Sequence, residues 1–567
     1  MTGRITGRTG FMLIGGVALA VYALFFASSY DQRILTLSGV YVILVLGYQF
    51  IFGHAGALSL AQGAFFGTGA YVTGILGSQF GTGFLLTFPL SIAVATIIAA
   101  IVAVPVLRLQ THYFALATLA LSQLLFLIGV NWESITGGAN GLSGVPGITI
   151  GAWSFTRGLP LLAIVWAIVG LAMVVAYRQM TPRRVAAFTV MRETPLAAPS
   201  FGIDAGMLRL RAFLLSAAFG GAAGALFVHT NRVVSPDTLG FGVMITCLTM
   251  TVVGGRFGIA GAVLGALLLT HLPEWFRFLD AYYLVAVGVL LLASVVFAPN
   301  GIVSLLAADT ERRTPARRPA GPGPVPFPPA RPTHLSAENL SKRYGGVQAL
   351  EAVTLHLESG DIAGVIGPNG AGKTTLANVL TGQAIPNTGR IQLGDDDITA
   401  QAAHGVARKG LARTFQTPQL PEGLRVRDVV ETAQSYTRTG TGLSVEAALA
   451  PFGLLEHAET PCGALPHGVR RRVEICRAVA TGPQILVLDE PAAGLTPDEQ
   501  AEISDICTRL AGEGLAILLI DHNVEFLRPL ATRLICMEAG RVIADATPAE
   551  TLADPRVRDA YFGMNDL

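Results

Sequence analysis

Long apolar segments in the first half of this 567-residue chain place the strongest constraint on its fold. A helix that crosses the core of a bilayer needs about 20 mostly apolar residues. Such segments lie at 11–28, 33–52, 57–79, 84–106, 113–131, 158–177, 212–229, 240–255, 257–273 and 281–298. They predict an all-α, polytopic membrane domain over residues 1–305, with about ten transmembrane helices.

The N-terminal segment has two features of a secretory signal peptide, because Arg4 and Arg8 precede an apolar run. That run is long, lacks a clear small-residue cleavage site and is followed by further apolar segments. We therefore expect a first transmembrane helix rather than a signal peptide. Glycines four residues apart, as at Gly220/Gly224 and Gly261/Gly265, predict closely packed membrane helices.

Basic residues predict the orientation of these helices, since cytoplasmic loops of membrane proteins carry an excess of Lys and Arg. Arg4 and Arg8 precede the first segment, and six arginines between Arg178 and Arg211 separate the sixth segment from the seventh. Both regions are expected in the cytoplasm, in agreement with the even number of helices between them. The loop 131–147 has no Lys or Arg and is expected on the outer face.

The chain changes character after the last apolar segment. Residues 306–334 are rich in Pro, Ala and Arg and predict an extended linker, with a ligand for a proline-reading module as the alternative. The arginines of the linker are expected near anionic lipid headgroups. Residues 335–567 have the composition of a soluble α/β domain. Nucleic acid is not an expected partner, because a net charge of +1 lacks the basic excess of a typical nucleic-acid binder.

The sequence VIGPNGAGKTT, residues 365–375, has the G-x-x-x-x-G-K-T spacing of a P-loop. It lies between the apolar strand IAGVI and the helical sequence LANVL, which is the context that the motif requires. Glycines let backbone N–H groups surround phosphate oxygens at a helix N-terminus. Lys373 would reach the terminal phosphates as a catalytic residue, and Thr374 would ligate Mg²⁺. The residues expected to bind ATP here are Gly367, Pro368, Asn369, Gly370, Ala371, Gly372, Lys373, Thr374 and Thr375.

Polar residues near the ends of other apolar strands predict the rest of an ATPase site. ILVLDE, residues 485–490, ends in Asp489, expected to hold Mg²⁺, and Glu490, expected to be the general base for the attacking water. His522 follows the apolar strand LLI and is expected to sense the γ-phosphate. Gln416 would contact Mg²⁺ or water and move with the phosphate, and Tyr344 would stack on adenine.

Together these residues resemble the ATP-binding cassette (ABC) family over the whole of 335–567. The sequences ARTFQ, RRRVEICRA, DEPAAGL and ATPAETLADPRVRDAYFG are similar to the G-type ATPase of branched-chain amino acid importers. The resemblance implies a cytoplasmic α/β P-loop ATPase that uses ATP and Mg²⁺. It also implies two cassettes that close head to tail, each ATP lying between one P-loop and the signature sequence of the other cassette.

The apolar half is similar to the M-type permease of the same importers, in GHAGALSLAQGAFFGTGAY, PVLRLQTHYFALATLALSQ, TGGANGL and VVGGRFGIAGAVLGA. The segment RETPLAAPSFGID, residues 192–204, resembles the coupling helix by which such permeases dock on the cassette. Proline is tolerated in a first helical turn, as at Pro195, but Pro199 limits the helix, so a shorter helix or a bent loop is expected. The residues that fit the coupling pattern are Glu193, Ala197, Ala198 and Gly202.

The signature position of the cassette is altered, because the family has LSGGQ where this chain has LPHGV. In the family, the serine hydroxyl and the following N–H groups bind the γ-phosphate of the partner's ATP. Pro466 offers neither group, His467 would supply a donor, and Gly468 is retained. Loss of one or two charge-assisted hydrogen bonds costs about 1.5–3 kcal/mol each. We therefore expect a heteromer in which the site with LPHGV is slow or mainly structural.

The expected function is ATP-driven import of a branched-chain amino acid, or a related small amino acid, amide or carboxylate, delivered by an extracytoplasmic binding protein. Expected partners are a second permease, a second ABC ATPase and membrane lipid, in a bacterial-type inner membrane with the ATPase in the cytoplasm. One alternative is an exporter half-transporter, although exporters of this layout usually carry fewer spans on long polar helices. The other is a non-transporting, ATP-driven signalling complex, which would need a larger outer domain than these loops provide.

Overall fold

The computed structural model describes residues 22, 25, 27–109, 111–275, 282–298, 300–307, 327, 330, 333–437 and 443–561. The chain divides into two compact units, which we call the membrane unit (Met1–Thr181 with Gly206–Arg313) and the cassette unit (Pro182–Ala205 with Thr314–Leu567). The predicted segment 11–28 lies largely outside the described residues, as does most of the predicted linker.

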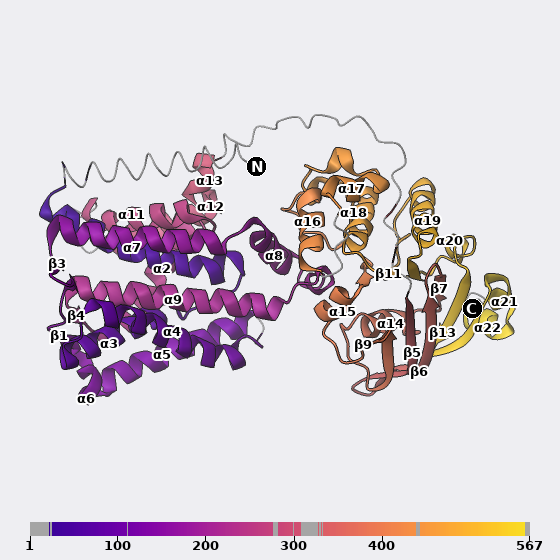
Figure 1. Ribbon diagram of the computed structural model, residues 1–567, viewed down its shortest axis with the longest axis horizontal. Helices are drawn as coiled ribbons and strands as arrows, with labels where there is room; N and C mark the ends of the chain where they lie inside the picture. Colours follow the sequence, from indigo (N-terminus) through magenta and orange to yellow (C-terminus); the bar gives the residue numbers. More distant parts are fainter. Residues whose placement is uncertain are drawn as a thin grey trace. The chain divides into compact units, whose positions relative to one another are not determined.

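The membrane unit is built from apolar helices, and each predicted segment from 33–52 onward corresponds to one of them (Figure 1). Among the described residues, five stretches are long and apolar enough to cross a membrane: Ser29–His54, Phe84–Val106, His112–Asn131, Gly158–Gln179 and Ala205–Asn231. The helices are α2 (Ser29–Tyr48), α3 (Gln62–Phe80), α4 (Phe84–Val106), α5 (Thr111–Asn131), α6 (Glu133–Thr136), α7 (Gly158–Gln179), α9 (Ala205–Asn231), α10 (Phe241–Gly254), α11 (Ile259–Trp275), α12 (Tyr283–Phe297) and α13 (Ile302–Ala307). Two small antiparallel sheets pair β1 (Leu142–Ser143) with β4 (Val233–Val234) and β2 (Ile148–Ile150) with β3 (Trp153–Phe155).

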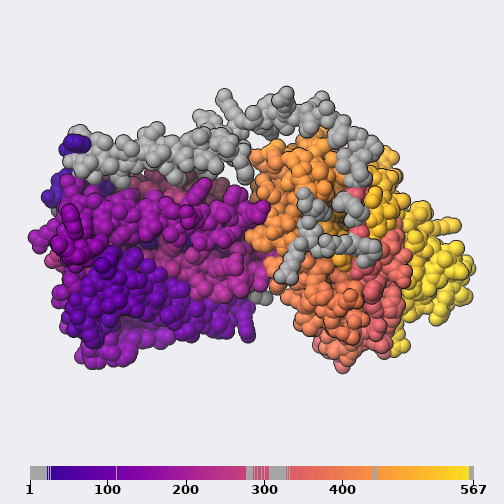
Figure 2. Space-filling view, in the orientation of Figure 1, coloured from indigo at the N-terminus to yellow at the C-terminus, as the bar shows by residue number. Residues whose placement is uncertain are grey.

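Helix α4 of the membrane unit, whose surface Figure 2 draws in indigo to magenta, buries small residues and exposes large apolar ones. On α4, Ala95 and Ala99 are buried, whereas Ile97 and Ile101 are exposed. Lipid tails are as apolar as leucine, so membrane helices associate through close packing of small residues. A Cβ at Gly224 of α9 would overlap the carbonyl oxygen of Phe66. The predicted role of this glycine in helix packing is thereby confirmed.

An irregular segment separates α2 from α3. The helix predicted over 57–79 therefore begins at Gln62, five residues later than expected. The chain leaves α2 through a π-helical turn, Gln49–His54. The Gln49 amide donates to the carbonyl oxygen of Gly255, at 2.9 Å, and the N–H of Leu60 donates to the Thr118 hydroxyl, also at 2.9 Å. Irregular backbone is tolerated at membrane depth only where protein or water satisfies it, and here side chains do so.

Two sheets organise the cassette unit. The first is parallel except at its β14 edge, in the order β10-β11-β12-β7-β13-β14, and the second is antiparallel, in the order β6-β5-β8-β9. The strands are β5 (His334–Tyr344), β6 (Val347–Glu358), β7 (Ile362–Ile366), β8 (Thr388–Leu393), β9 (Asp396–Asp397), β10 (Leu411–Arg413), β11 (Ile485–Asp489), β12 (Ala516–Ile520), β13 (Arg533–Glu538) and β14 (Arg541–Ala546). The helices are α8 (Pro182–Glu193), α14 (Lys373–Leu380), α15 (Ala403–Lys409), α16 (Val426–Tyr436), α17 (Val445–Leu449), α18 (His467–Ala480), α19 (Pro497–Gly512), α20 (Val524–Leu527), α21 (Pro548–Ala553) and α22 (Pro555–Tyr561).

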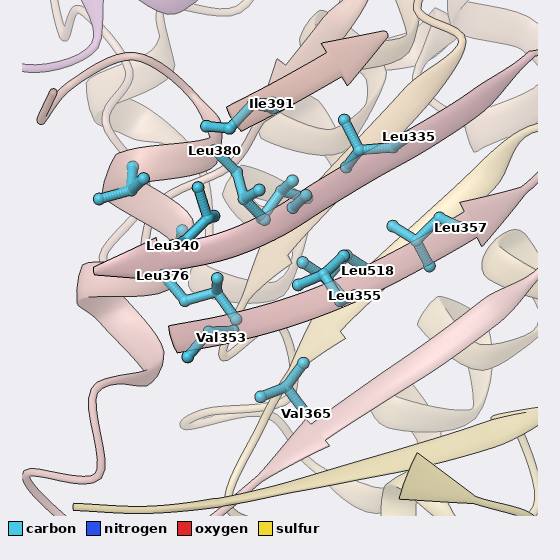
Figure 3. Packing of buried hydrophobic residues seen from close by; sticks show 14 of the residues in the cluster. Leu335, Leu340, Val353, Leu355, Leu357, Val365, Leu376, Leu380, Ile391 and Leu518 are labelled. Atoms are coloured by element: carbon cyan, nitrogen blue, oxygen red, sulfur yellow. The ribbon is translucent and has the colours of Figure 1, made fainter. Parts of the chain in front are cut away.

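The core of the cassette unit lies where the two sheets meet the helix after the P-loop (Figure 3). Leu340 of β5 and Val353 of β6 pack in one cluster with Leu376 of α14, Val365 of β7 and Leu518 of β12. All five side chains are buried. This packing fixes α14 against the strands whose ends carry the predicted site.

Two residues of the predicted linker contact later parts of the cassette unit. Phe327 is buried, with its ring 5.1 Å from that of Phe452 and the Arg509 guanidinium 4.7 Å from its centroid. The N–H of Ala330 donates to the carbonyl oxygen of Glu513 at 2.9 Å. Phe327 and Ala330 are therefore held by an aromatic contact and a backbone hydrogen bond, respectively.

Candidate functional site

Three parallel strands bring the predicted site residues to one edge of the six-stranded sheet (Figure 1). Asp489 of β11 pairs with Ile520 of β12, and Ile520 pairs with Val365 of β7. The carboxyl ends of these strands are therefore level with one another. The P-loop, Glu490 and His522 follow β7, β11 and β12, so they meet at the edge where parallel α/β sheets bind ligands.

The P-loop has a backbone conformation that depends on its glycines. Gly367, Gly370 and Gly372 have φ of 153°, 82° and 101°, which favours glycine. A Cβ at Gly367 would overlap the carbonyl oxygen of Met537, whereas a Cβ at Gly370 would meet nothing within 4 Å. An open glycine loop at the N-terminus of α14 fits a phosphate chain. The other predicted loop residues, Pro368, Asn369, Ala371, Thr374 and Thr375, occupy the same loop and the first turn of α14.

Lys373 lies over its own loop. Its Nζ donates to the carbonyl oxygens of Gly367, at 2.6 Å, and Pro368, at 2.9 Å. Burial lowers the pKa of this ammonium, while the nearby carboxylates of Glu490 and Asp489 oppose that shift. The loop carbonyls thus satisfy this buried cation, as burial of a charge requires.

Gln416, Glu490 and His522 come together although they are far apart in the sequence. Gln416 Nε2 donates to Glu490 Oε2 at 2.8 Å, and His522 Nδ1 lies 3.8 Å from the same oxygen. Glu490 has a φ of 45°, a conformation that costs a non-glycine residue about 1–3 kcal/mol. Its N–H donates to the carbonyl oxygen of Ile520 at 2.7 Å. The backbone thus holds this carboxylate at the end of β11.

The predicted Mg²⁺ ligands have oxygen donors of the kind that this ion prefers. Asp489 is buried at the end of β11, and its Oδ2 pairs with Arg413 Nη2 at 2.8 Å. Thr374 is exposed in the first turn of α14. The amide of Gln416 binds Glu490 in this conformation. The hydroxyl of Thr374 and the carboxylate of Asp489 are oxygen donors of the kind that a magnesium nucleotide needs.

A wholly buried ion pair holds the segment that carries Gln416. Arg471 Nη1 lies 3.0 Å from Glu474 Oε2 and donates to the carbonyl oxygen of Phe415 at 2.6 Å. Arg471 Nη2 donates to the carbonyl oxygens of Gln416, at 2.6 Å, and Glu490, at 3.3 Å. Neither Arg471 nor Glu474 is among the residues that the sequence predicts as functional. The only signal available for them is their place in RRRVEICRA, directly after the signature position.

The predicted adenine contact lies on β5, and the altered signature lies at the start of α18. Tyr344 ends β5, is about half exposed, and has Lys342 Nζ 5.1 Å from its ring. Pro466 is the N-cap of α18 and makes no side-chain capping bond, and His467 is the first residue of the helix. A Cβ at Gly468 would overlap the Glu499 carboxylate, so a negative charge lies against this end of α18.

The segment predicted to couple the two halves packs within the cassette unit. Helix α8 ends at Glu193, and the chain then turns through Pro195 into a 3-10 helix, Ala198–Phe201, with Pro199 in its first turn. Pro195 therefore lies in a turn and not in a helix, and the segment combines this turn with a short helix. Ala197 and Ala198 are fully buried.

Backbone and side-chain hydrogen bonds hold this segment. Glu193 Oε2 accepts from the N–H of Gly423 at 3.2 Å, and the carbonyl oxygen of Gly202 accepts from Arg408 Nε at 2.9 Å. Gly202 has a φ of 74°, and a Cβ there would lie 2.7 Å from the carbonyl oxygen of Tyr436. Glycine is therefore required at position 202.

Arg477 joins this segment to the strand before Gln416. Its Nη1 donates to the Ser200 hydroxyl at 3.1 Å, its Nη2 donates to the carbonyl oxygen of Arg413 at 3.1 Å, and it lies 4.7 Å from the centroid of the Phe201 ring. Burial lowers the pKa of this guanidinium to about 10. Arg477 is not predicted from the sequence, because an arginine near the end of a polar helix is typical of a solvated surface.

Two family models match the chain. Residues 32–295 match the permease component of branched-chain amino acid transport systems, and residues 350–493 match the ABC transporter ATPase. The high-affinity branched-chain amino acid transport ATP-binding protein BraF of Pseudomonas aeruginosa is 34% identical over 248 residues, which is 40% of this chain and 97% of BraF. The high-affinity branched-chain amino acid transport ATP-binding protein LivG of Escherichia coli K12 is 36% identical over 248 residues, which is 40% of this chain and 97% of LivG.

Two further proteins likewise match 40% of this chain. The lipopolysaccharide export system ATP-binding protein LptB of E. coli K12 is 36% identical over 236 residues, 40% of this chain and 97% of LptB. A crystal structure of a nucleotide-free ATP-binding cassette from an ABC transporter is 30% identical, covering 40% of this chain and 98% of that chain with a TM-score of 0.37. With the BraF and LivG matches and the permease match, the chain belongs to the ABC transporters: it is a branched-chain amino acid type permease fused to an ATP-binding cassette that hydrolyses ATP for transport.

Proposed function

We propose that this transporter imports a branched-chain amino acid, or a related small amino acid, amide or carboxylate, which an extracytoplasmic binding protein delivers. The permease match over residues 32–295 carries the proposal, because it concerns the membrane half, where the solute passes. The names of BraF and LivG agree with it. The proposed setting is a bacterial-type inner membrane, with the cassette unit in the cytoplasm.

Transport by reconstituted protein tests this proposal. Proteoliposomes with the chain and its partner subunits are expected to accumulate labelled leucine only with ATP on the cassette side and a binding protein on the other side. Similarity of the cassette alone does not separate import from export, since LptB serves an export system. ATP-dependent efflux of the solute, or uptake that needs no binding protein, would contradict the proposal.

The geometry supports a division of roles within the ATP site. Lys373 and the P-loop would bind the phosphates, while Thr374 and Asp489 would hold Mg²⁺, which neutralises phosphate charge when it is bound. Glu490 would accept a proton from the attacking water at a carboxylate oxygen. Gln416 orients that carboxylate through the 2.8 Å hydrogen bond, and His522 lies beside it. Gln416 would exchange this bond for a contact to the metal or water when nucleotide binds.

The LPHGV end of α18 supports an asymmetric assembly. Pro466 has no N–H, and the Glu499 carboxylate lies against Gly468, so this end disfavours a phosphate. The second cassette of the complex would supply an intact signature to the P-loop site of this chain.

ATPase assays on the chain alone and with its partner test the assembly. The homodimer is expected to turn over at least about tenfold more slowly than the heteromer, since about 1.5 kcal/mol per lost charge-assisted hydrogen bond already gives a factor of ten. Replacement of LPHGV by LSGGQ is expected to raise turnover by the homodimer. Equal turnover by the homodimer and the heteromer would contradict the asymmetry.

Segment 192–204 is proposed to transmit nucleotide-driven movement from the cassette to the membrane helices. Gly202→Val is expected to displace the segment, because its side chain would meet the Tyr436 carbonyl and φ would be strained. Transport per ATP hydrolysed should then fall several-fold while ATP hydrolysis persists. Gly512→Ala, where a Cβ would meet nothing within 4 Å, is the matched control. Loss of ATP hydrolysis in proportion to transport would contradict a coupling role.

A further inference from the structure

Arg413 connects the predicted Mg²⁺ strand to the P-loop helix. Its Nη2 pairs with Asp489 Oδ2 at 2.8 Å, and both side chains are at most 5% exposed. Its Nη1 donates to Asn378 Oδ1 at 2.6 Å and to the Thr381 hydroxyl at 3.3 Å, both in α14 or directly after it. One planar guanidinium therefore holds β11 and α14 together.

The two elements that Arg413 joins are the ones that carry the proposed metal ligands. Asp489 ends β11, and Thr374 lies in the first turn of α14. The ion pair uses Oδ2 of Asp489. Among the described residues, none donates a hydrogen bond to Oδ1 of this carboxylate. Arg413 thus fixes the rotation of the carboxylate and leaves one of its oxygens for a cation.

We propose that Arg413 is a positioning residue for Mg²⁺: it sets the carboxylate of Asp489 and the spacing between β11 and the P-loop helix. A residue that forms a hydrogen bond with a metal ligand, without touching the metal itself, commonly contributes about 10–100-fold to metal affinity. Lysine cannot replace this arginine, because its single ammonium lacks the two separate NH₂ groups with which the planar guanidinium reaches Asp489 and Asn378. The inference rests on the proposed role of Asp489 as a Mg²⁺ ligand.

A Mg²⁺ titration of ATP binding tests the inference without hydrolysis. The full-length chain carries Glu490→Gln, and bound radiolabelled ATP is measured as Mg²⁺ is raised from a metal-free buffer. Arg413→Lys is expected to raise the Mg²⁺ concentration at half-saturation about tenfold and to leave ATP binding in EDTA unchanged. Arg425→Lys, at an exposed ion pair with Glu459, is the matched control and should leave the midpoint unchanged.

A second variant keeps the test independent of folding. Asn378→Ala removes the shortest of the hydrogen bonds from Arg413 to α14 and the residues after it, and it leaves the charges of Arg413 and Asp489 in place, so it should raise the midpoint in the same direction. A purely structural role would lower the unfolding temperature of the nucleotide-free chain and leave the Mg²⁺ midpoint in place, which would overturn the inference.

Asp489→Asn separates this inference from the proposed function. A raised midpoint in Asp489→Asn together with unchanged midpoints in Arg413→Lys and Asn378→Ala would overturn the role of Arg413 alone. An unchanged midpoint in Asp489→Asn would overturn the proposed metal ligand, and the role of Arg413 with it.

Discussion

Replacement of Glu490 by Gln is expected to lower ATP turnover at least about 100-fold and to leave ATP binding intact. The amide keeps the size of the side chain and its bond to Gln416, but it cannot accept a proton from water. We expect the side chain to keep its place in the variant, because the backbone of residue 490 is fixed. Its φ is 45°, and its N–H donates to the carbonyl oxygen of Ile520. The measurement is phosphate release by the reconstituted complex, together with retention of radiolabelled ATP.

Glu525→Gln is the control for the loss of a negative charge near the site. Glu525 is an exposed residue of α20, three residues after His522, and no role in the site is proposed for it. Its replacement should leave turnover unchanged. If Glu490→Gln keeps more than about one tenth of the original turnover, another group activates the water, because a general base contributes about 10²–10⁴-fold.

Arg471→Met is expected to lower the free energy of unfolding of the cassette unit by about 3–5 kcal/mol, because it leaves Glu474 buried without its partner. The carbonyl oxygens of Phe415 and Gln416 lose their donor as well, so ATP turnover should fall too. Pulse proteolysis of the full-length chain in urea measures the stability change. Arg425→Met, at an exposed pair, should cost about 1 kcal/mol or less.

Lower pH should reduce the loss of unfolding free energy that Arg471→Met causes. Burial raises the pKa of Glu474, so its ionised form opposes folding as pH rises from the unfolded pKa through the folded pKa. Without Arg471 the folded pKa rises further, and the penalty at neutral pH grows. The deficit should therefore shrink as pH falls toward the ordinary glutamate pKa of about 4.3. A second substitution, Glu474→Met, should recover most of the stability, and failure to do so would exclude the unpaired charge as the cause.

Local pattern was enough to predict the membrane helices from 33–52 onward and the strands and helix that carry the ATP site. Apolar length alone located the segments from 33–52 to 281–298, because a bilayer demands about 20 apolar residues whatever the neighbouring helices are. The P-loop and the strand ending in Asp489 could be predicted, because glycine spacing and a run of apolar residues are local properties of the sequence. Their meeting at one sheet edge follows from the parallel pairing of β7, β11 and β12 in the structure.

The sequence by itself determined the permease helices, the P-loop ATPase and the acids at its strand end, since each rests on residues that are neighbours in the chain. Only the tertiary structure decided that residues 182–205 pack within the cassette unit and that Arg413, Arg471 and Arg477 are buried. An arginine resembles a surface residue until its acceptors are known, and here those acceptors are mainly carbonyl and carboxylate oxygens from distant segments. Burial of such a charge is tolerable only when distant partners satisfy it, and no local pattern records those partners.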